Sequence, residues 1–264
     1  MFTAVLGDAA KREMAHTRFA DIRSVDETGS TNADLLDLAR EGAPEGIVLV
    51  ADHQTAGRGR GGRSWVAPAG ASLLLSVLVR PAARVAGLSS MAMGLAAADA
   101  VDDVAGFRPR LKWPNDLVWP GDVPGLGSRN DRKLAGILAE AHWPSDEEVA
   151  VVIGIGLNVN WPQDLPDDLS DIATAINHVA GHDIDREDVL VHLLQRFDQR
   201  YDELRRGSIV DAWRAASATL GRRVRVELGS ETIEGIAHDV TDDGHLVVGD
   251  RTIAVGDVVH LRNT

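Results

Sequence analysis

The sequence predicts an α+β protein in which a mixed β-sheet flanked by helices is followed by a small C-terminal β-barrel. Up to about residue 218, apolar runs of strand length alternate with patterns of helical period, which is typical of one layered body. After Leu220 the pattern changes to short alternating strands separated by Gly, Asp and Ser turns. A length of 264 residues, 44% of them hydrophobic, suits one domain of middle size and one small one. We therefore divide the chain into an N-terminal extension (1–24), a main domain (25–218) and the barrel (219–264).

In the first half of the chain, apolar runs and a helix cap define the elements. Residues up to about Ile22 carry no motif and are predicted to be a poorly ordered extension or a short helix. The polar residues 30–32 can cap a helix from Ala33 to Arg40, whose leucines give it one apolar side. The following apolar runs predict strands at Ile47–Asp52 and Ala71–Val79 and a buried helix at Leu88–Val104.

The second half continues the same alternation. Apolar runs predict further strands at Arg110–Trp113, Lys133–Ala141 and Val149–Asn160. Between two of them, residues 121–132 (GDVPGLGSRNDR) have the composition of a flexible excursion. An amphipathic helix begins at Asp185 and ends at Gly207, and a shorter helix covers Ile209–Ala218.

Composition excludes several classes of protein. The chain contains no cysteine, so a disulfide framework, a thiolate metal site and a cysteine nucleophile are all excluded. The N-terminus lacks a signal peptide, and no apolar run is long enough to span a membrane. A formal net charge of -13 argues against a surface that binds nucleic acid. These features predict a soluble cytoplasmic protein without nucleic-acid or membrane partners.

The run GRGRGGRSW at Gly57–Trp65 is the most informative motif, because it places three arginines among four glycines directly after a predicted strand. Glycine loses the most backbone entropy on ordering, and arginine donates in a fixed fork that fits phosphate and carboxylate oxygens. The run predicts a mobile cationic loop that orders around an anion. An ordinary solvated loop is the simpler alternative, and an RGG-type nucleic-acid contact disagrees with the acidic chain.

Two shorter motifs carry unusual polar residues. Helix capping explains about one side chain of TGSTN (28–32), so the others are free to hydrogen-bond a neutral polar ligand. In KWPND (112–116), the proline ends the strand and leaves Asn115 and Asp116 at its end. Such a pair commonly forms a plain turn, but it also suits a nucleotide that carries Mg²⁺.

Two predicted strands carry residues that weaken ordinary packing. In KLAGILAE (133–140), Lys133 stands on an otherwise apolar strand, where a solvated lysine of an edge strand is the simpler alternative. Gly136 removes a side chain from the same strand, and IGIGLNVN (153–160) brings two more glycines and two asparagines. Strands that give up packing in this way predict a flat ligand against bare backbone.

Taken in order, TGSTN, HQTAGRGRGGRSW, KWPND, KLAGILAE and GIGLNVN closely resemble the motifs of the biotin protein ligases, the biotin–acetyl-CoA-carboxylase ligase family. The resemblance covers roughly residues 25–205 as the catalytic domain and about 220–264 as an SH3-like C-terminal domain. It implies the class II synthetase-like biotin/lipoate ligase fold. Because some 24 residues precede the motifs, it also implies the monofunctional type, without the N-terminal DNA-binding domain of the repressors.

The resemblance implies an ATP-dependent ligase that acts in two steps. The biotin carboxylate attacks the α-phosphate of MgATP, which gives biotinoyl-5′-adenylate and pyrophosphate. A lysine of a biotin carboxyl carrier domain, from acetyl-CoA carboxylase or a related carboxylase, then takes the biotinoyl group and AMP leaves. Biotin, ATP and Mg²⁺ are thus the implied small molecules, without a tightly bound prosthetic group, and a homodimer is left open.

The resemblance also implies roles for the matching positions. The implied catalytic residues are Lys133, Arg58, Arg60 and Asp116, the last also as a contact for Mg²⁺. The implied biotin-binding residues are Ser30, Thr31, Asn32, Gln54, Arg58, Gly59, Arg60, Lys133, Gly136 and Gly156. The implied ATP-binding residues are Arg60, Arg63, Trp65, Asn115, Asp116, Lys133 and Asn158. Lys133 would bridge the biotin carboxylate and the α-phosphate, and the loop would close over the adenylate.

Two other functions fit the same fold. A lipoate–protein ligase shares the acyl-adenylate chemistry, but its apolar tail site has no need of the hydroxyl and amide groups at residues 30–32 and 54. The second is a non-catalytic biotin-binding module. The presence of Lys133, the loop arginines and KWPND argues against it.

Overall fold

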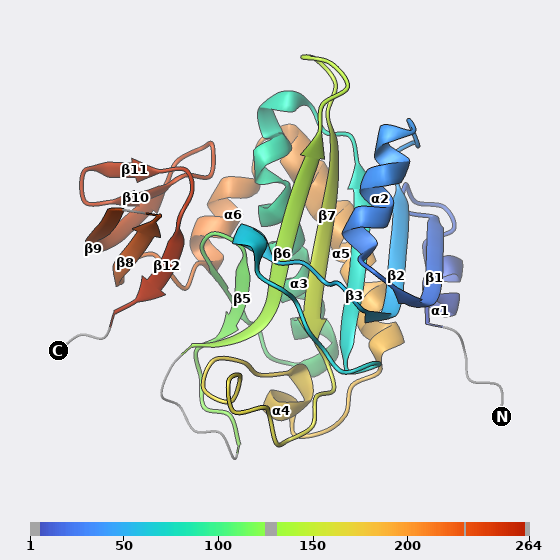
Figure 1. Cartoon of the computed structure of the whole chain (residues 1–264), viewed down its shortest axis with the longest axis horizontal. Coiled ribbons are helices and arrows are strands. Elements are labelled where there is room, and N and C mark those ends of the chain that lie inside the picture. The colour runs from blue at the N-terminus through green and yellow to red at the C-terminus, as the bar shows by residue number, and fades with distance from the viewer. Residues whose placement is uncertain (1–5, 125–130, 230, 262–264) are drawn as a thin grey trace.

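A seven-stranded mixed sheet forms the centre of the molecule, with strand order β1-β2-β3-β7-β6-β5-β4 (Figure 1). The computed structural model describes residues 6–124, 131–229 and 231–261. The strands of this sheet are β1 (Asp21–Thr28), β2 (Ile47–Gln54), β3 (Ser72–Val79), β4 (Arg110–Lys112), β5 (Asp116–Trp119), β6 (Arg132–His142) and β7 (Ala150–Asn158). Only β1 and β2 pair in parallel, and the other neighbours are antiparallel.

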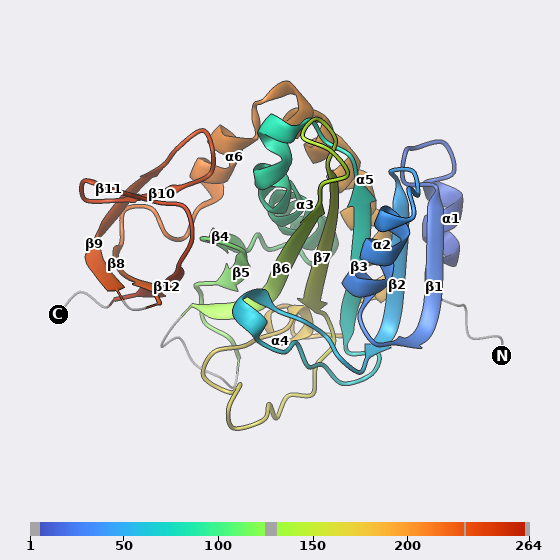
Figure 2. The same ribbon diagram turned by 45° about the horizontal axis from the view of Figure 1, so that its top comes forward.

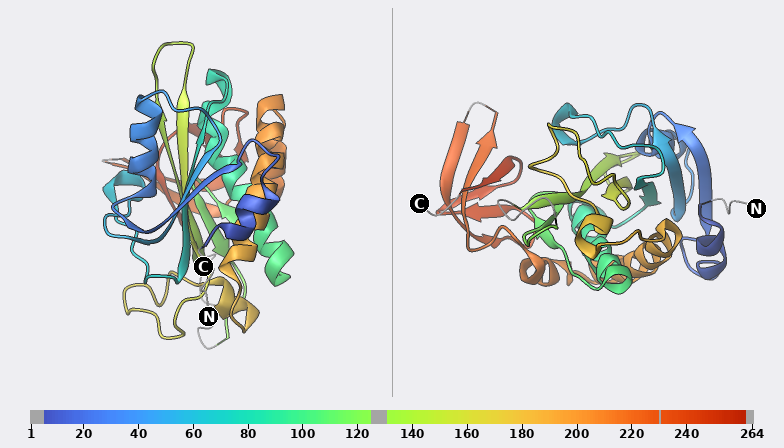
Figure 3. Two further views of the ribbon diagram at one scale, coloured as in Figure 1. Left: turned by 90° about the vertical axis from the view of Figure 1, so that its right-hand side faces the viewer. Right: turned by 90° about the horizontal axis from the view of Figure 1, so that it is seen from below.

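Helices cover the two faces of the sheet unequally, as the layers in Figure 3 show. Alternate residues of the strands, such as Ile153 and Ile155 of β7, join the large core under α3 (Ser89–Ala105) and α5 (Arg186–Arg206). The opposite face packs a smaller core against α2 (Thr31–Arg40). Because α2 covers only part of this face, the backbone of β6 and β7 is left for the loop that carries the arginines. The remaining helices are α1 (Asp8–Glu13), α4 (Ile176–Ala180) and α6 (Ile209–Ala216).

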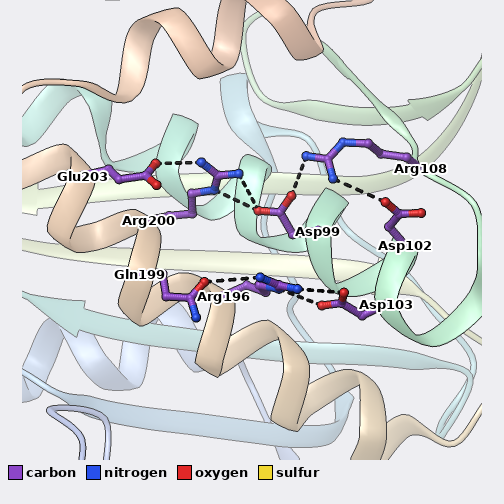
Figure 4. A network of polar contacts seen from close by, with 8 residues as sticks. All are labelled: Asp99, Asp102, Asp103, Arg108, Arg196, Gln199, Arg200 and Glu203. Atoms are coloured by element: carbon purple, nitrogen blue, oxygen red, sulfur yellow. Dashed lines mark hydrogen bonds and ion pairs between the residues drawn. The ribbon is translucent and has the colours of Figure 1, made fainter.

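A charged network joins α3 and α5 on the side away from that loop (Figure 4). Arg200 Nε lies 2.8 Å from Asp99 Oδ2, and Arg196 Nε lies 2.7 Å from Asp103 Oδ2. The remaining members shown in Figure 4 are Asp102, Arg108, Gln199 and Glu203. Hydrogen bonds and ion pairs within the network fix the two helices against each other on this side of the sheet.

The C-terminal barrel is a curved five-stranded antiparallel sheet beside β4 and β5, of order β11-β10-β9-β8-β12 (Figure 2). Its strands are β8 (Arg223–Leu228), β9 (Glu231–Val240), β10 (Leu246–Val248), β11 (Arg251–Ile253) and β12 (Asp257–His260). Trp113 joins the barrel to the main domain, because its indole Nε1–H donates to Gly244 O at 3.0 Å and its backbone N–H donates to Thr219 Oγ1 at 3.0 Å. The barrel is therefore docked against the strand that carries KWPND.

The structure confirms the predicted helices and strands and adds the strands β1 and β5 and the short helix α4. β1 crosses the expected boundary at residue 24 and pairs with β2, and α1 matches the short-helix alternative for the N-terminal residues. β5 begins at Asp116, which therefore starts a strand rather than ending one. The edge-strand interpretation of Lys133 is wrong, because β6 lies between β5 and β7. Within the predicted excursion, residues 125–130 lie outside the described residues.

None of the helices among the described residues combines the length and the apolar character that crossing a membrane requires.

Candidate active site

A cavity of about 200 Å³ lies where the start of α2, the arginine loop (Gly57–Trp65), β6 and β7 meet. It gathers nearly all of the residues that the sequence predicts for the site. Those in its lining are Ser30, Thr31, Asn32, Gln54, Arg58, Gly59, Arg60, Arg63, Trp65, Asn115, Asp116, Lys133, Gly136 and Gly156. Asn158 is the predicted residue that is not among them. Residues from segments far apart in the sequence thus form one concave site.

One end of the cavity is a network of neutral hydroxyl and amide side chains that ends at the carboxylate of Glu140. Thr31 donates from its backbone N–H and its hydroxyl to Gln54 Oε1, at 2.8 and 3.0 Å, and its Oγ1 lies 2.7 Å from Ser76 Oγ. Ser76 in turn donates to Asn32 Oδ1 at 2.6 Å, and Asn32 Nδ2 donates to Glu140 Oε2 at 2.8 Å. Ser30 is the N-cap residue of α2, but its side chain makes no capping hydrogen bond. This end can therefore hold a neutral polar group.

The floor of the cavity is a bare stretch of backbone on β6 and β7. Gly136 and Gly156 are paired directly across the two strands, and the indole of Trp65 lies on them. A methyl group added at Gly156 would come within 2.3 Å of the Trp65 ring. The sequence predicts a flat group against bare backbone here, and in the structure an indole of the protein lies on this surface.

Lys133 faces the cavity because of a β-bulge. The register between β5 and β6 shifts so that Val118 pairs with Lys133 while Leu117 pairs with Ala135. Leu134 is therefore the extra residue, and the strand residues on either side of it change faces. As a result, Lys133 Nζ lies on the same side as Gly136, 3.1 Å from the position that a Cβ would occupy there.

The Lys133 ammonium pairs with Asp116 Oδ1 at 2.7 Å, and it lies 5.4 Å from the centroid of the Trp65 ring. The Lys133 backbone is held as well, because its N–H donates to Ile172 O and its carbonyl accepts from Thr174 N–H. Lysine and aspartate from neighbouring strands are thus held together at the middle of the cavity.

The arginine loop forms a small hairpin. Arg58 and Ser64 make an antiparallel bridge, and a single turn at residues 60–62 joins the two sides. Gly61 and Gly62 have φ angles of +68° and +78°, a conformation that other residues rarely adopt. The glycines therefore allow the tight turn that presents three arginines from one short segment.

Carboxylates of the protein hold all three loop arginines. Arg58 Nη2 lies 3.3 Å from Glu140 Oε2. Arg60 donates to Asp257 and to Gly256 O, both in the barrel. Arg63 Nη2 lies 2.8 and 2.9 Å from the two carboxylate oxygens of Asp257. The anions around the loop in this structure are thus carboxylates of the chain itself. Burial alone would raise the pKa of Asp257, but Arg60 and Arg63 outweigh burial and lower the pKa.

Lys112 is a second lysine in the cavity, and it forms no ion pair among the described residues. Burial lowers the pKa of its ammonium, and the nearby carboxylates of Asp116 and Asp131 offset this only in part. The chain contains only three lysines, and two of them line this one cavity. A cavity with this many cations favours an anionic ligand.

Two predicted residues have local structural partners. Asn115 lines the cavity, but its Nδ2 donates to Ile137 O at 2.6 Å and so ties KWPND to β6. Asn158 is buried, and its amide joins Ser72 Oγ to Thr174 O. Because Thr174 also holds the Lys133 backbone, Asn158 supports the lysine from behind the cavity.

The motifs assign no role to four residues that the structure places at the site: Ser76, Glu140, Lys112 and Asp257. The first three had a signal, since Ser76 interrupts an apolar strand and the other two belong to motifs already singled out. Asp257 had none, because it lies almost two hundred residues from the loop that it contacts.

The described residues contain no group of three or more His, Asp or Glu side chains placed to hold a metal ion. A Mg²⁺ ion that arrives on the phosphates of a nucleotide needs few protein ligands, and Asp116 in the cavity wall is one carboxylate that could meet it.

Two family models and several known proteins match this chain. The model of the biotin/lipoate A/B protein ligase family matches residues 24–158, and the model of the biotin protein ligase C-terminal domain matches residues 219–261. A biotin–[acetyl-CoA-carboxylase] ligase of Mycobacterium tuberculosis is 43% identical, over 90% of this chain and 88% of the relative.

Two solved structures extend the similarity to three dimensions. The biotin protein ligase from Aquifex aeolicus in complex with biotin and ATP superposes with a TM-score of 0.73 at 26% identity, over 93% of this chain and 100% of that chain. The Leishmania major biotin protein ligase in complex with biotinyl-5-AMP gives a TM-score of 0.60 at 25% identity, over 92% and 99% of the two chains.

Proposed function

Since the chain belongs to the biotin/lipoate A/B protein ligase family, we propose that it makes biotinoyl-5′-AMP from biotin and ATP and transfers biotin to a lysine of a carboxyl carrier domain. The observation that carries this proposal is the cavity itself, in which a neutral polar end adjoins a cationic middle. Biotin combines a neutral ureido ring with a carboxylate, so its two ends match the two parts of the cavity.

In the first step, an oxygen of the biotin carboxylate attacks the α-phosphorus of ATP, the bond to the β-phosphate oxygen breaks, and pyrophosphate leaves. Two anionic groups must approach each other, so fixed cations at their meeting point lower the barrier most. Lys133 suits this role, because the bulge at Leu134 aims it into the cavity and Asp116 orients its ammonium. Lys112 adds a second positive charge nearby.

The loop arginines suit the phosphates and the adenylate. Arg58, Arg60 and Arg63 are presented by one hairpin over the cavity, where they can exclude water from a mixed anhydride that hydrolyses readily. Trp65 supplies an apolar wall for the nucleotide from the same hairpin. Mg²⁺ enters this scheme with ATP, as part of the substrate.

In the second step, the uncharged amine of the carrier lysine attacks the biotinoyl carbonyl, the bond from the carbonyl carbon to the phosphate oxygen breaks, AMP leaves and the amine loses a proton to water. Asp116 and Lys133 stand beside the anhydride in this scheme, and the ammonium of Lys133 offsets the charge that develops on the departing phosphate. The AMP leaving group needs no protonation, which makes a fixed cation sufficient.

The neutral network at Thr31, Asn32 and Gln54 favours biotin over lipoate, because the dithiolane of lipoate offers no donors or acceptors to match it. An apolar ring would cover these hydroxyl and amide groups without adding hydrogen bonds to them, so such a site favours a ligand that can exchange hydrogen bonds with them. A non-catalytic binding module would have no use for the lysine–aspartate pair between β5 and β6.

Transfer to a carrier tests the proposal. The chain is incubated with MgATP, the carrier domain of an acetyl-CoA carboxylase and either biotin or lipoate, and the product is detected by mass and, for biotin, by streptavidin binding. We expect one biotin on the acceptor lysine, and none on a matched carrier in which that lysine is arginine. Absence of any transfer with ATP, or transfer of lipoate in place of biotin, would contradict the proposal.

We extend the proposal to partners. The Mycobacterium tuberculosis relative is named for acetyl-CoA carboxylase, which supports a carboxylase as the acceptor of biotin. A net charge of -13 supports a function without nucleic acid. The homodimer stays a prediction, which analytical ultracentrifugation with and without biotin and ATP checks.

A further inference from the structure

The barrel contributes a carboxylate to the cavity wall. Asp257, the first residue of β12, lines the cavity together with the arginine loop. It accepts hydrogen bonds from both Arg60 and Arg63, and its backbone neighbour Gly256 accepts a further one from Arg60. One carboxylate of the C-terminal domain therefore holds two arginines of the catalytic domain.

The orientation of Arg60 makes this contact more than a surface ion pair. Its Nη2 donates to both acceptors in the barrel, so this end of the guanidinium is directed toward β12. Three quarters of the Arg60 side chain is covered, with 26% exposed, which limits the other directions it can take. A phosphate in the cavity can therefore engage this end of Arg60 only if the contact with Asp257 is broken or shared.

The charge balance of the cavity leads to the same conclusion. Its wall contains three arginines and two lysines, and the carboxylates of Glu140, Asp257 and Asp116 already pair with four of these five cations. A carboxylate in this position occupies the donors that a phosphate would use, and it repels the phosphate by its own charge.

We propose that Asp257 is a positioning residue that holds the arginine loop against the barrel and competes with the phosphates of the nucleotide for Arg60 and Arg63. The competition rests on the proposed function, whereas the holding of the loop does not. In this arrangement the barrel sets both the order of the loop and the affinity for ATP.

The test replaces Asp257 by asparagine, which keeps the shape of the side chain and removes its charge. Hydrogen–deuterium exchange of residues 57–65 is measured without ligand, and the α,β-methylene analogue of ATP, which cannot release pyrophosphate, is titrated calorimetrically in the presence of biotin. Asp250→Asn is the matched control, because Asp250 is an exposed residue in the turn between β10 and β11 of the same barrel.

We expect the amide hydrogens of residues 57–65 to exchange faster in Asp257→Asn than in the wild type. We also expect the variant to bind the analogue about threefold to tenfold more tightly, because a partly exposed ion pair that competes with the phosphates has been removed. The affinity of Asp257→Asn for biotin should equal that of the wild type. In Asp250→Asn, both the loop exchange and the affinity for the analogue should equal those of the wild type. Unchanged loop exchange overturns the holding role, and unchanged or weaker binding of the analogue overturns the competition. A wild-type enzyme that binds no nucleotide refutes the proposed function but leaves the exchange result valid.

A second measurement tests the proposal in the wild-type enzyme, so that it does not depend on the folding of Asp257→Asn. In the wild-type enzyme, raising the salt concentration from about 0.05 to about 0.5 M screens exposed ion pairs strongly. We expect faster exchange in residues 57–65 and no change in the amides of β6 and β7. Loop exchange that is independent of salt would overturn the proposal.

Discussion

Single residues at this site depend on local irregularities of the backbone. Lys133 and Gly136 lie on one side of the sheet although they are three positions apart, an odd spacing that regular alternation would place on opposite sides, because the bulge at Leu134 shifts the alternation. The motif KLAGILAE predicts that both residues belong to the site, but a bulge leaves no trace in residue spacing. The sequence could therefore identify the lysine but not its orientation or its pairing with Asp116.

Lys133→Ala should lose most of the adenylation activity while keeping the fold, since the side chain is partly exposed and packs into no core. Loss of one fixed donor at a developing charge typically reduces the rate about 10²- to 10³-fold. Biotin-dependent exchange of pyrophosphate into ATP measures this step, with Lys11→Ala, at an exposed lysine of α1, as the control. A mutant within a few-fold of the wild type would refute the assigned role.

Lys112 should set the alkaline limit of the reaction. Burial lowers the pKa of its ammonium, so it loses its proton at a lower pH than an exposed lysine does. As the pH rises, the cavity then loses a positive charge and the KM for ATP should increase. In Lys112→Arg the charge persists, and the alkaline fall in kcat/KM for ATP should move to higher pH. Superimposable pH profiles of the two enzymes would contradict this role.

At the scale of elements, β6 and β7 give up side-chain packing to make room on one face. Gly136 pairs with Gly156 across the two strands, and the sequence pattern predicts this bare surface. It does not predict that Trp65 of the arginine loop lies on it, because that contact depends on how a distant hairpin folds back. The sequence does not predict β1 for a different reason: most of its residues are exposed, so it contains no apolar run.

Gly156→Ala should displace the Trp65 indole, because the new methyl group would lie 2.3 Å from the ring. The ring can tilt away, so we expect a folded protein in which the loop is misplaced. Misplacement of this size is expected to raise the KM for ATP about tenfold or more. Steady-state kinetics check this against Gly87→Ala, where a methyl group would meet nothing within 4 Å. Equal KM values for the two variants would show that the indole position is unimportant.

At the scale of the whole molecule, the barrel is part of the site. Asp131 of the main domain binds both Arg222 and His260 of the barrel, at 2.6 and 2.8 Å. The sequence predicts a separate C-terminal domain, but it could not predict this docking or the contact of Asp257 with the loop. Both join residues far apart in the chain, and such contacts follow from the folded arrangement rather than from a local motif.

Asp131→Asn should weaken the docking of the barrel. Burial alone would raise the pKa of Asp131, but His260 and Arg222 outweigh it and lower the pKa. A lowered carboxyl pKa contributes stability above its unfolded value and loses it as the pH falls through the folded value. We expect a loss of about 1–3 kcal/mol at pH 7. In thermal unfolding, the difference from the wild type should shrink in acid. A difference that does not depend on pH would show that the charge of Asp131 is not the cause.

We expect this cavity, above all, to activate biotin as an adenylate. Exchange of radiolabelled pyrophosphate into ATP, measured with biotin, with lipoate and without either acid, tests it most directly because no carrier protein is needed. We predict rapid exchange that depends on biotin and is absent or much slower with lipoate. Exchange supported by lipoate and not by biotin, or no exchange with either acid, would contradict the account.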